Sequence, residues 1–143
     1  MKAREIMTAN PRTVTPDTNL PEVARLMQSE DVGIVPVVDG AGSRQLIGVV
    51  TDRDIALRVV GEGRDPNSVR VSDVMSTNLR TAKENDSVDD VMSLMGEQQV
   101  RRIPIVDERG ALVGIVAQAD VVLEGKSDKK AERTIEKISE PNR

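Results

Sequence analysis

The sequence repeats itself, and one half echoes the other residue by residue. The segment Met7–Thr13 (MTANPRT) recurs as Met75–Thr81 (MSTNLRT), and Gly48–Asp54 (GVVTDRD) recurs as Gly114–Asp120 (GIVAQAD). The spacing between these segments is kept, apart from a loop that is two residues shorter in the second copy. Self-similarity over most of a chain indicates tandem structural units. The 143 residues are therefore expected to fold as two equivalent repeats.

Each copy contains a helix-type pattern followed by strand-type runs. Four apolar positions per copy have the i, i+3, i+4, i+7 spacing of one helical face. They are Leu20, Val23, Ala24 and Met27, repeated as Val88, Val91, Met92 and Met95. Asn19 and Ser87 stand at the N-cap positions of these helices. Residues 35–38 and 103–106 are rich in β-branched side chains and predict strands.

A second strand in each copy leads into a second helix. Leu46–Val50 is a short apolar run containing Gly48, which is typical of a buried strand with a close backbone approach. Thr51 marks a helix start, where open N–H groups favour an anion or a polar ligand group. The Thr51–Asp54 corner is therefore the first candidate binding site. The helices expected after the two corners cover residues 54–60 and 120–124.

The composition excludes several kinds of chemistry. The chain has no histidine and no cysteine, which removes thiol nucleophiles, disulfides, Cys/His zinc sites and histidine acid–base catalysis. It has no Phe, Tyr or Trp, so no base can stack on an aromatic side chain. A net charge of −4 gives no overall basic field for nucleic acid or an anionic membrane. No apolar run approaches the ~20 residues of a membrane span, which favours a soluble, cytoplasmic protein.

The repeat also sets the expected architecture. We expect an α/β (α+β) fold in which two βαββα repeats pack through their small sheets with pseudo-two-fold symmetry. Half a chain of this size buries too little surface to be securely stable alone, so the copies should share one core. The expected segments are repeat 1 at 1–61, a connector at 62–70, repeat 2 at 71–124 and a charged C-terminal tail at 125–143.

The order of these motifs resembles the CBS domain. Gly48–Asp54 reads Gly-hydrophobic-hydrophobic-Thr-x-x-Asp, and Val35–Asp39 before it reads hydrophobic-Pro-hydrophobic-Val-Asp. The same order recurs in the second copy, so the pair resembles a Bateman module over roughly residues 1–124. It is similar to stand-alone bacterial proteins made of two CBS repeats. The resemblance implies a non-enzymatic regulatory module that binds an adenosyl ligand between the repeats and assembles as a homodimer.

The resemblance also implies a main nucleotide site. In the family, an aspartate of one repeat binds ribose hydroxyls and faces the second strand of the other repeat, which points here to Asp54. Arg101 and Arg102 would bind phosphate, because a guanidinium matches phosphate oxygens, and adenine would lie between aliphatic side chains. The expected ligand is AMP, ADP or ATP, with NAD and S-adenosylmethionine as alternatives. The implied residues are Val49, Thr51, Asp54, Thr81, Val100, Arg101, Arg102, Ile103 and Pro104.

A mirror-related second site departs from the family pattern. Its implied residues are Thr13, Val32, Gly33, Ile34, Pro36, Ile115 and Asp120. Ala117 stands where the first copy has a threonine, and Gly33-Ile34 stands where the second copy has two arginines. A phosphate there loses a hydroxyl and two cations, and each hydrogen bond to a charged group contributes about 1.5–3 kcal/mol. We therefore expect the second site to be the weaker one.

Simpler interpretations of the same residues stay open. Helix capping alone also explains Asp54 and Asp120, because aspartate is common at helix starts for that reason. Solvated surface charge or a salt bridge also explains the Arg101-Arg102 pair. Arg53 and Arg58 fit solvent or dimer contacts better than ligand contacts.

Two other functions are weighed against the regulatory module. One is a structural or interaction module whose clefts are vestigial and that binds a protein partner. The other is an enzyme, which is disfavoured because no nucleophile has a base beside it and because Asp52 and Asp54 should point in different directions. No cofactor, metal or membrane partner is expected, and the net charge disfavours nucleic acid.

Overall fold

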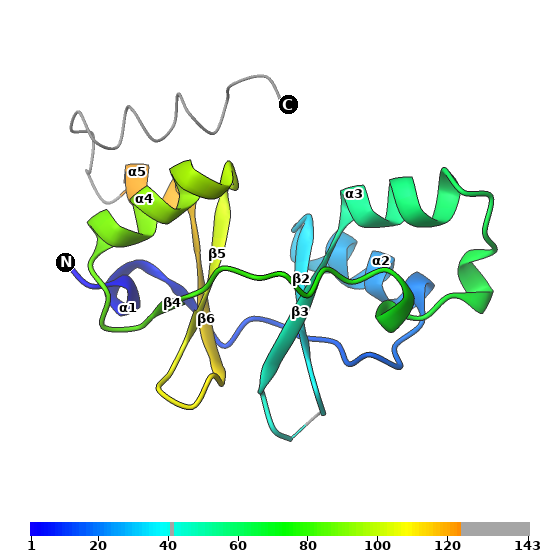
Figure 1. Ribbon diagram of the computed structural model, residues 1–143, viewed down its shortest axis with the longest axis horizontal. Coiled ribbons are helices and arrows are strands. Elements are labelled where there is room, and N and C mark those ends of the chain that lie inside the picture. The colour runs from blue at the N-terminus through cyan, green and yellow to red at the C-terminus, as the bar shows by residue number, and fades with distance from the viewer. Residues whose placement is uncertain (41, 124–143) are drawn as a thin grey trace. The chain divides into compact units, whose positions relative to one another are not determined.

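The computed structural model describes residues 1–40 and 42–123, and the chain path can be followed in Figure 1. Contacts divide the chain into two compact units. Unit 1 contains Met1–Pro11 and the chain from Arg80 onward, and unit 2 contains Arg12–Leu79. Each unit therefore takes most of its residues from one repeat and a segment from the other. The tail expected at 125–143 lies outside the described residues.

Unit 1 is built on a four-stranded sheet in the order β1-β6-β5-β4. β5 (Arg102–Val106) and β6 (Leu112–Ala117) form an antiparallel hairpin. β1 (Thr8–Ala9) pairs antiparallel with β6, and β4 (Ala82–Lys83) pairs parallel with β5. The helices of this unit are α1 (Ala3–Ile6), α4 (Val88–Gln98) and α5 (Gln118–Leu123). This mixture of helices with a small sheet confirms the expected α+β class.

Unit 2 repeats this arrangement around a two-stranded sheet. Its antiparallel hairpin is β2 (Ile34–Val38) and β3 (Leu46–Thr51). Val14 bridges β2 in parallel and Ser76 bridges β3 antiparallel, at the places that β4 and β1 take in unit 1. The helical elements are α2 (Leu20–Glu30), α3 (Asp52–Ile55), the π-helix η1 (Ala56–Val60) and the 3-10 turns η2 (Pro66–Ser68) and η3 (Val71–Asp73). The duplication seen in the sequence is thus present in the strand order.

Both long helices begin where the sequence predicts. The Asn19 side chain accepts a hydrogen bond from the Glu22 N–H at 2.9 Å. The Ser87 hydroxyl oxygen accepts one from the Asp90 N–H at 3.0 Å. Each cap satisfies an N–H group that the first helical turn leaves without an intrahelical partner. The two predicted N-caps are therefore confirmed.

Two details of the helices differ from the expectation. Ala24 is exposed, and Leu26 packs against the core of unit 2 instead, because a leucine buries more apolar surface than an alanine. The second helix of each repeat also begins two residues earlier than expected, α3 at Asp52 and α5 at Gln118. Thr51 caps α3, which sets that start, and the helix then widens into the π-helix η1.

Each unit has a hydrophobic core of its own, and residues of both repeats contribute to it. Ala3 and Ile6 of the first repeat are buried with side chains of α4 and β5 in unit 1. Val71 and Val74 of the second repeat are buried with side chains of α2, β2 and β3 in unit 2. Each core thus buries apolar side chains from the first segment of the other repeat. These side chains add to the small amount of apolar surface that one repeat can bury alone.

A glycine in each central strand lets an exchanged segment cross it closely. We name residues Val74–Ser76 the strap. Ser76 and Val49 exchange both backbone hydrogen bonds, at 3.0 and 2.8 Å. A Cβ on Gly48 would lie 2.9 Å from the Ser76 carbonyl oxygen, and a Cβ on Gly114 would meet the N-terminal segment in the same way. The close backbone approach predicted at Gly48 is therefore confirmed.

The segment expected as a connector, residues 62–70, is exposed up to residue 68 and packed at its end. Val69 is buried in the core of unit 2. Just after it, the Val71 N–H donates to the Thr18 carbonyl oxygen at 2.9 Å, and the Ser72 N–H donates to the Pro16 carbonyl oxygen at 3.0 Å. The chain is therefore anchored to unit 2 well before it enters unit 1.

The turn between β5 and β6 is held by Asp107. Its carboxylate accepts hydrogen bonds from the N–H groups of Ala111 at 3.0 Å and Arg109 at 2.9 Å. These bonds favour the charged form and hold the pKa of the Asp107 carboxyl below its ordinary value. The resulting stabilisation is present at neutral pH and is lost as the pH falls through the lowered pKa.

Candidate functional site

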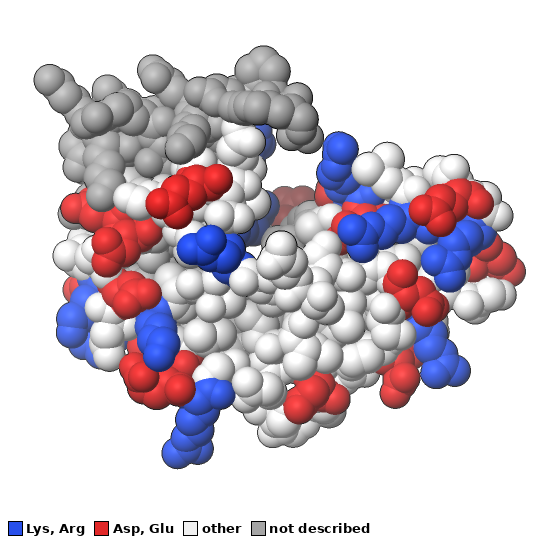
Figure 2. All heavy atoms as spheres, in the orientation of Figure 1, with Lys and Arg blue, Asp and Glu red and all other residues white. Residues whose placement is uncertain are grey.

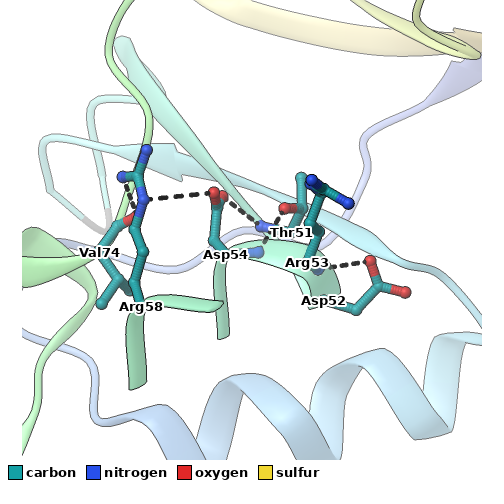
Figure 3. A network of polar contacts seen from close by, with 6 residues as sticks. All are labelled: Thr51, Asp52, Arg53, Asp54, Arg58 and Val74. Carbon is teal, nitrogen blue, oxygen red and sulfur yellow. Dashed lines mark hydrogen bonds and ion pairs between the residues drawn. The ribbon is translucent and has the colours of Figure 1, made fainter. Parts of the chain in front are cut away.

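The Thr51–Asp54 corner joins β3 to α3 in unit 2 (Figure 3). The Thr51 hydroxyl oxygen accepts a hydrogen bond from the Asp54 N–H at 3.0 Å. In return, Asp54 Oδ2 accepts one from the Thr51 N–H at 3.0 Å. This reciprocal pair is a capping box. Helix capping is therefore one role of the Asp54 side chain.

The N–H groups at this helix start have acceptors within the protein, so the prediction that they are open is wrong. The Asp52 N–H donates to the Gly33 carbonyl oxygen at 2.9 Å. The Arg53 N–H donates to the Asp52 carboxylate at 2.8 Å, and the Asp54 N–H is bonded to Thr51. Internal acceptors thus use the donors that a bound anion would need. The chemistry offered by the corner is that of its side chains.

Arg58 extends the corner toward the strap (Figure 3). Its Nε lies 3.9 Å from Asp54 Oδ1, and its guanidinium donates a hydrogen bond to the Val74 carbonyl oxygen at 2.9 Å. The Arg58 side chain is 48% exposed and that of Asp54 is 12% exposed. Arg58 therefore takes part in the internal contacts of unit 2, a role that the sequence interpretation missed. The available signal was its i, i+4 spacing from Asp54.

Asp52 points away from Asp54 (Figure 3). Its carboxylate lies over Gly33, where a Cβ would stand 2.9 Å from Asp52 Oδ2. Two carboxylates must face one site to share a proton or a metal ion. Among residues 1–40 and 42–123, no group of three or more acidic side chains is placed to hold a metal ion. The predicted divergence of Asp52 and Asp54 is confirmed, and it offers no carboxylate pair for catalysis.

The equivalent corner of unit 1 keeps half of the capping box. Asp120 Oδ2 accepts a hydrogen bond from the Ala117 N–H at 2.9 Å. Alanine has no hydroxyl to make the return bond. The Gln118 N–H donates to the Arg101 carbonyl oxygen at 2.8 Å, which places the Arg101-Arg102 pair beside this second corner. Gly33-Ile34 takes the same place beside the first corner.

Residues of the predicted main site come from both units. Unit 2 holds Val49, Thr51 and Asp54, and unit 1 holds Thr81, Val100, Arg101, Arg102, Ile103 and Pro104. Within unit 1, Ile103 and Pro104 are buried in β5 and Arg102 is half-buried, whereas Arg101 is exposed. The structure brings together the members of each group within its own unit. The joining of the two groups in one site stays a prediction.

The second predicted site is divided in the same manner. Unit 2 holds Thr13, Val32, Gly33, Ile34 and Pro36, and unit 1 holds Ile115 and Asp120. In unit 2, β2 places Ile34 opposite Thr51 and Pro36 opposite Val49. The corner implied for the main site and the strand implied for the second site are therefore neighbours in unit 2.

On the face drawn in Figure 2, the basic side chains of the described residues do not gather into one patch. Positive and negative side chains are interspersed on the described part of the face shown in Figure 2. This agrees with the net charge of −4, and phosphate backbones bind where basic side chains gather. No helix in the described ranges combines the length and the apolar character needed to cross a membrane.

The chain matches the family model described as the CBS domain over residues 3–61 and 71–126. The CBS domain-containing protein YhcV of Bacillus subtilis is 42% identical over 139 residues, which cover 97% of this chain and 96% of that protein. Hypoxic response protein 1 of Mycobacterium tuberculosis is 34% identical over 119 residues, which cover 83% of this chain and 81% of that protein.

Solved structures show the same fold. The crystal structure of Hypoxic Response Protein I, described with two coordinated zinc ions, has a TM-score of 0.78 at 32% identity, covering 86% of this chain and 98% of that chain. The crystal structure of CBSX2 in complex with AMP has a TM-score of 0.74 at 27% identity, covering 87% of this chain and 96% of that chain. The resemblance predicted from the motifs is confirmed by these matches.

Proposed function

We propose, given that this chain belongs to the CBS-domain family, that it is a non-enzymatic regulatory module that binds an adenosyl ligand at the Thr51–Asp54 corner. The proposed ligand is AMP, ADP or ATP. The family match supports a ligand-binding regulatory role, and the AMP complex of the similar protein CBSX2 supports an adenosyl ligand. Binding would change the packing or the assembly of the protein.

The proposal depends above all on how Asp54 is held. Its Oδ2 is bonded to the Thr51 N–H, whereas its Oδ1 lies 3.9 Å from Arg58 Nε, beyond hydrogen-bond distance. Oδ1 therefore keeps the capacity to accept hydrogen bonds from ribose hydroxyls. The Thr51 hydroxyl accepts from the Asp54 N–H and keeps its own proton to donate. The capping bonds hold both side chains in place, and they leave Asp54 Oδ1 and the Thr51 hydroxyl proton for a ligand.

The rest of the ligand would contact unit 1. Arg101 is exposed and Arg102 is half-buried, and a guanidinium supplies paired donors for phosphate oxygens. Val100, which precedes the two arginines and is 37% exposed, offers an aliphatic side chain to adenine, which suits a chain without aromatic residues. The second site would bind phosphorylated ligands more weakly, because Gly33-Ile34 supplies no cation there.

Calorimetric titration of the full chain with AMP, ADP, ATP, NAD and S-adenosylmethionine tests the proposal. We expect Asp54→Asn to weaken AMP binding about 10- to 150-fold, which corresponds to a charge-assisted hydrogen bond of about 1.5–3 kcal/mol. The asparagine keeps an acceptor for the Thr51 N–H, so the corner should stay folded. Asp17→Asn, which neutralises an exposed carboxylate elsewhere in unit 2, should bind AMP as the wild type does.

No heat signal and no thermal stabilisation with any of the five ligands at millimolar concentration would refute the proposal. Ligand binding to the folded state must raise the apparent stability, so the second readout covers a binding reaction with little heat. Equal AMP affinity in Asp54→Asn and the wild type would leave adenosyl binding intact and refute the Thr51–Asp54 corner as its place.

An interaction module is the second candidate function. It is favoured by Leu57 and Val60 on η1, which are 52% and 69% exposed. Exposed apolar side chains of this kind mark surfaces that another protein or a second copy covers. Asp54→Ala separates the two roles. Self-association is measured by sedimentation in the presence of AMP. If the surface acts independently of nucleotide, Asp54→Ala should associate as the wild type does. A difference between the two proteins would mean that nucleotide binding controls the surface.

A further inference from the structure

One side chain links the Thr51–Asp54 corner to the strap inside unit 2 (Figure 3). Arg58 lies on η1, four residues after Asp54, so the two side chains are neighbours on one helical face. Its Nε faces Asp54 Oδ1 at 3.9 Å, and the same guanidinium donates to the Val74 carbonyl oxygen at 2.9 Å. A planar guanidinium presents several donors in fixed directions, so it can face two acceptors at once.

The strap is the segment by which the chain leaves unit 2. Val74 is fully buried in the core of that unit. Ser76 is hydrogen-bonded in both directions to Val49 of β3, and the chain enters unit 1 at Arg80. β3 itself ends at Thr51. The corner and the strap are therefore connected twice, through the backbone of β3 and through the side chain of Arg58.

The second repeat has no arginine at the position from which Arg58 makes this link. The residue at the position equivalent to Arg58 is Glu124, which lies outside the described residues. An ionised glutamate has no hydrogen to donate to a carbonyl oxygen or a carboxylate. The side-chain link belongs to the first copy, which is also the copy that keeps the threonine of the corner.

We propose that Arg58 is a positioning residue through which ligand occupancy at Asp54 orders the strap. The inference rests on the proposed function, because it takes Asp54 as the ribose contact. Ribose hydroxyls on Oδ1 hold the carboxylate in one orientation, and the carboxylate then holds Arg58. A more firmly held Arg58 keeps its hydrogen bond to the Val74 carbonyl oxygen for more of the time. Ligand occupancy is thereby passed to the point where the chain leaves unit 2.

Amide hydrogen exchange at Ser76, followed by NMR on the full chain, measures the order of the strap. Arg58→Gln removes the charge and shortens the reach. Without ligand, the Ser76 N–H should exchange about threefold faster in this variant, which is the effect expected from losing a half-exposed ion pair. With saturating AMP, exchange at Ser76 should slow several-fold in the wild type. Arg58→Gln should need more AMP for saturation and should show no added protection once saturated.

Arg53→Gln is the matched control. It makes the same change of charge in the same helical segment, at an exposed residue whose guanidinium makes none of the contacts drawn in Figure 3. Its Ser76 exchange should follow the wild type in both states. Arg58→Lys keeps the charge and should restore part of the AMP-dependent protection, which a loss of folding alone would not do.

Equal slowing of Ser76 exchange by AMP in the wild type and in Arg58→Gln would overturn the inference. So would ligand-free exchange in Arg58→Gln that matches Arg53→Gln. Failure of the proposed function has a different signature, because AMP would then change neither the heat signal nor Ser76 exchange in the wild type. The ligand-free difference between the two variants would still show whether Arg58 holds the strap.

Discussion

Single residues at the two corners decide what each corner can hold. Asp54 and Asp120 accept the same backbone hydrogen bond, from the N–H three residues before them, so both cap their helices. Only the first corner places a hydroxyl beside the carboxylate. This difference was predictable, because Ala117 occupies the position of Thr51 in the second copy. The contact between Asp52 and Gly33 was not, because it joins residues from the two ends of a hairpin.

Asp52 should lower the affinity of the second site for phosphate. Its carboxylate covers Gly33, whereas the equivalent residues of unit 1 are Gln118 and Arg101. A negative charge about 4 Å from a phosphate costs ~1 kcal/mol even when water screens it fully. Asp52→Gln should therefore raise the AMP affinity of the weaker site about fivefold. Calorimetry would show this as a stronger second binding step.

Adenosine is the control ligand for this variant, because it has the base and the ribose of AMP but no phosphate. Wild type and Asp52→Gln should bind adenosine equally well. The same gain for adenosine as for AMP would contradict an electrostatic effect and would indicate that the carboxylate blocks Gly33 sterically.

Among the elements, the strap can pair with β3 only because one residue of that strand is a glycine. Gly48 is the point on β3 that the strap crosses, and Ser76 pairs with Val49 beside it. The repeated glycine was visible in the sequence as a sign of close approach. The identity of the approaching segment was not, since it comes from the other repeat.

Gly48→Ala should destabilise the protein by about 1–3 kcal/mol, the usual cost of overpacking. The added Cβ would lie 2.9 Å from the Ser76 carbonyl oxygen and 3.1 Å from the Met75 sulfur, and a backbone oxygen cannot move aside easily. Urea unfolding would measure the change. Gly40→Ala, where a Cβ would meet nothing within 4 Å, should change stability by less than 1 kcal/mol in either direction. Equal losses in the two variants would mean that the strap does not constrain Gly48.

For the whole molecule, the main feature is the exchange of first segments between the repeats. Met1–Pro11 belongs to the first repeat by sequence and to unit 1 by contacts. Each unit therefore completes its core with residues from the first segment of the other repeat. The two units cannot be separated by cutting the chain at a single place, because the chain passes between them twice.

Ile6→Ala tests this exchange. Ile6 lies in the first repeat but is buried in the core of unit 1, so the variant should lose about 2–5 kcal/mol of stability there. Amide exchange should become faster in β5 and β6, while β2 and β3 keep their protection. Val59→Ala, in the core of unit 2, should have the opposite pattern. If Ile6→Ala made amide hydrogen exchange faster in β2 and β3 alone, Ile6 would not belong to the core of unit 1, which would contradict the proposed swap of first segments.

The sequence by itself determined the duplication, the α+β class, the N-caps at Asn19 and Ser87 and the unequal corners at Thr51 and Ala117. These features depend on residues that are neighbours in the chain, or on comparing one copy with the other, and helix periodicity and capping act over four residues or fewer. They can therefore be worked out before any fold is known.

Only the tertiary structure decided which segments complete each core, which acceptors use the N–H groups of the α3 start, and where Asp52 and Arg58 direct their side chains. Each of these depends on a contact between residues that are far apart in the chain or on a choice among several partners. Packing and the pairing of buried backbone groups make that choice, and they act on the folded chain as a whole.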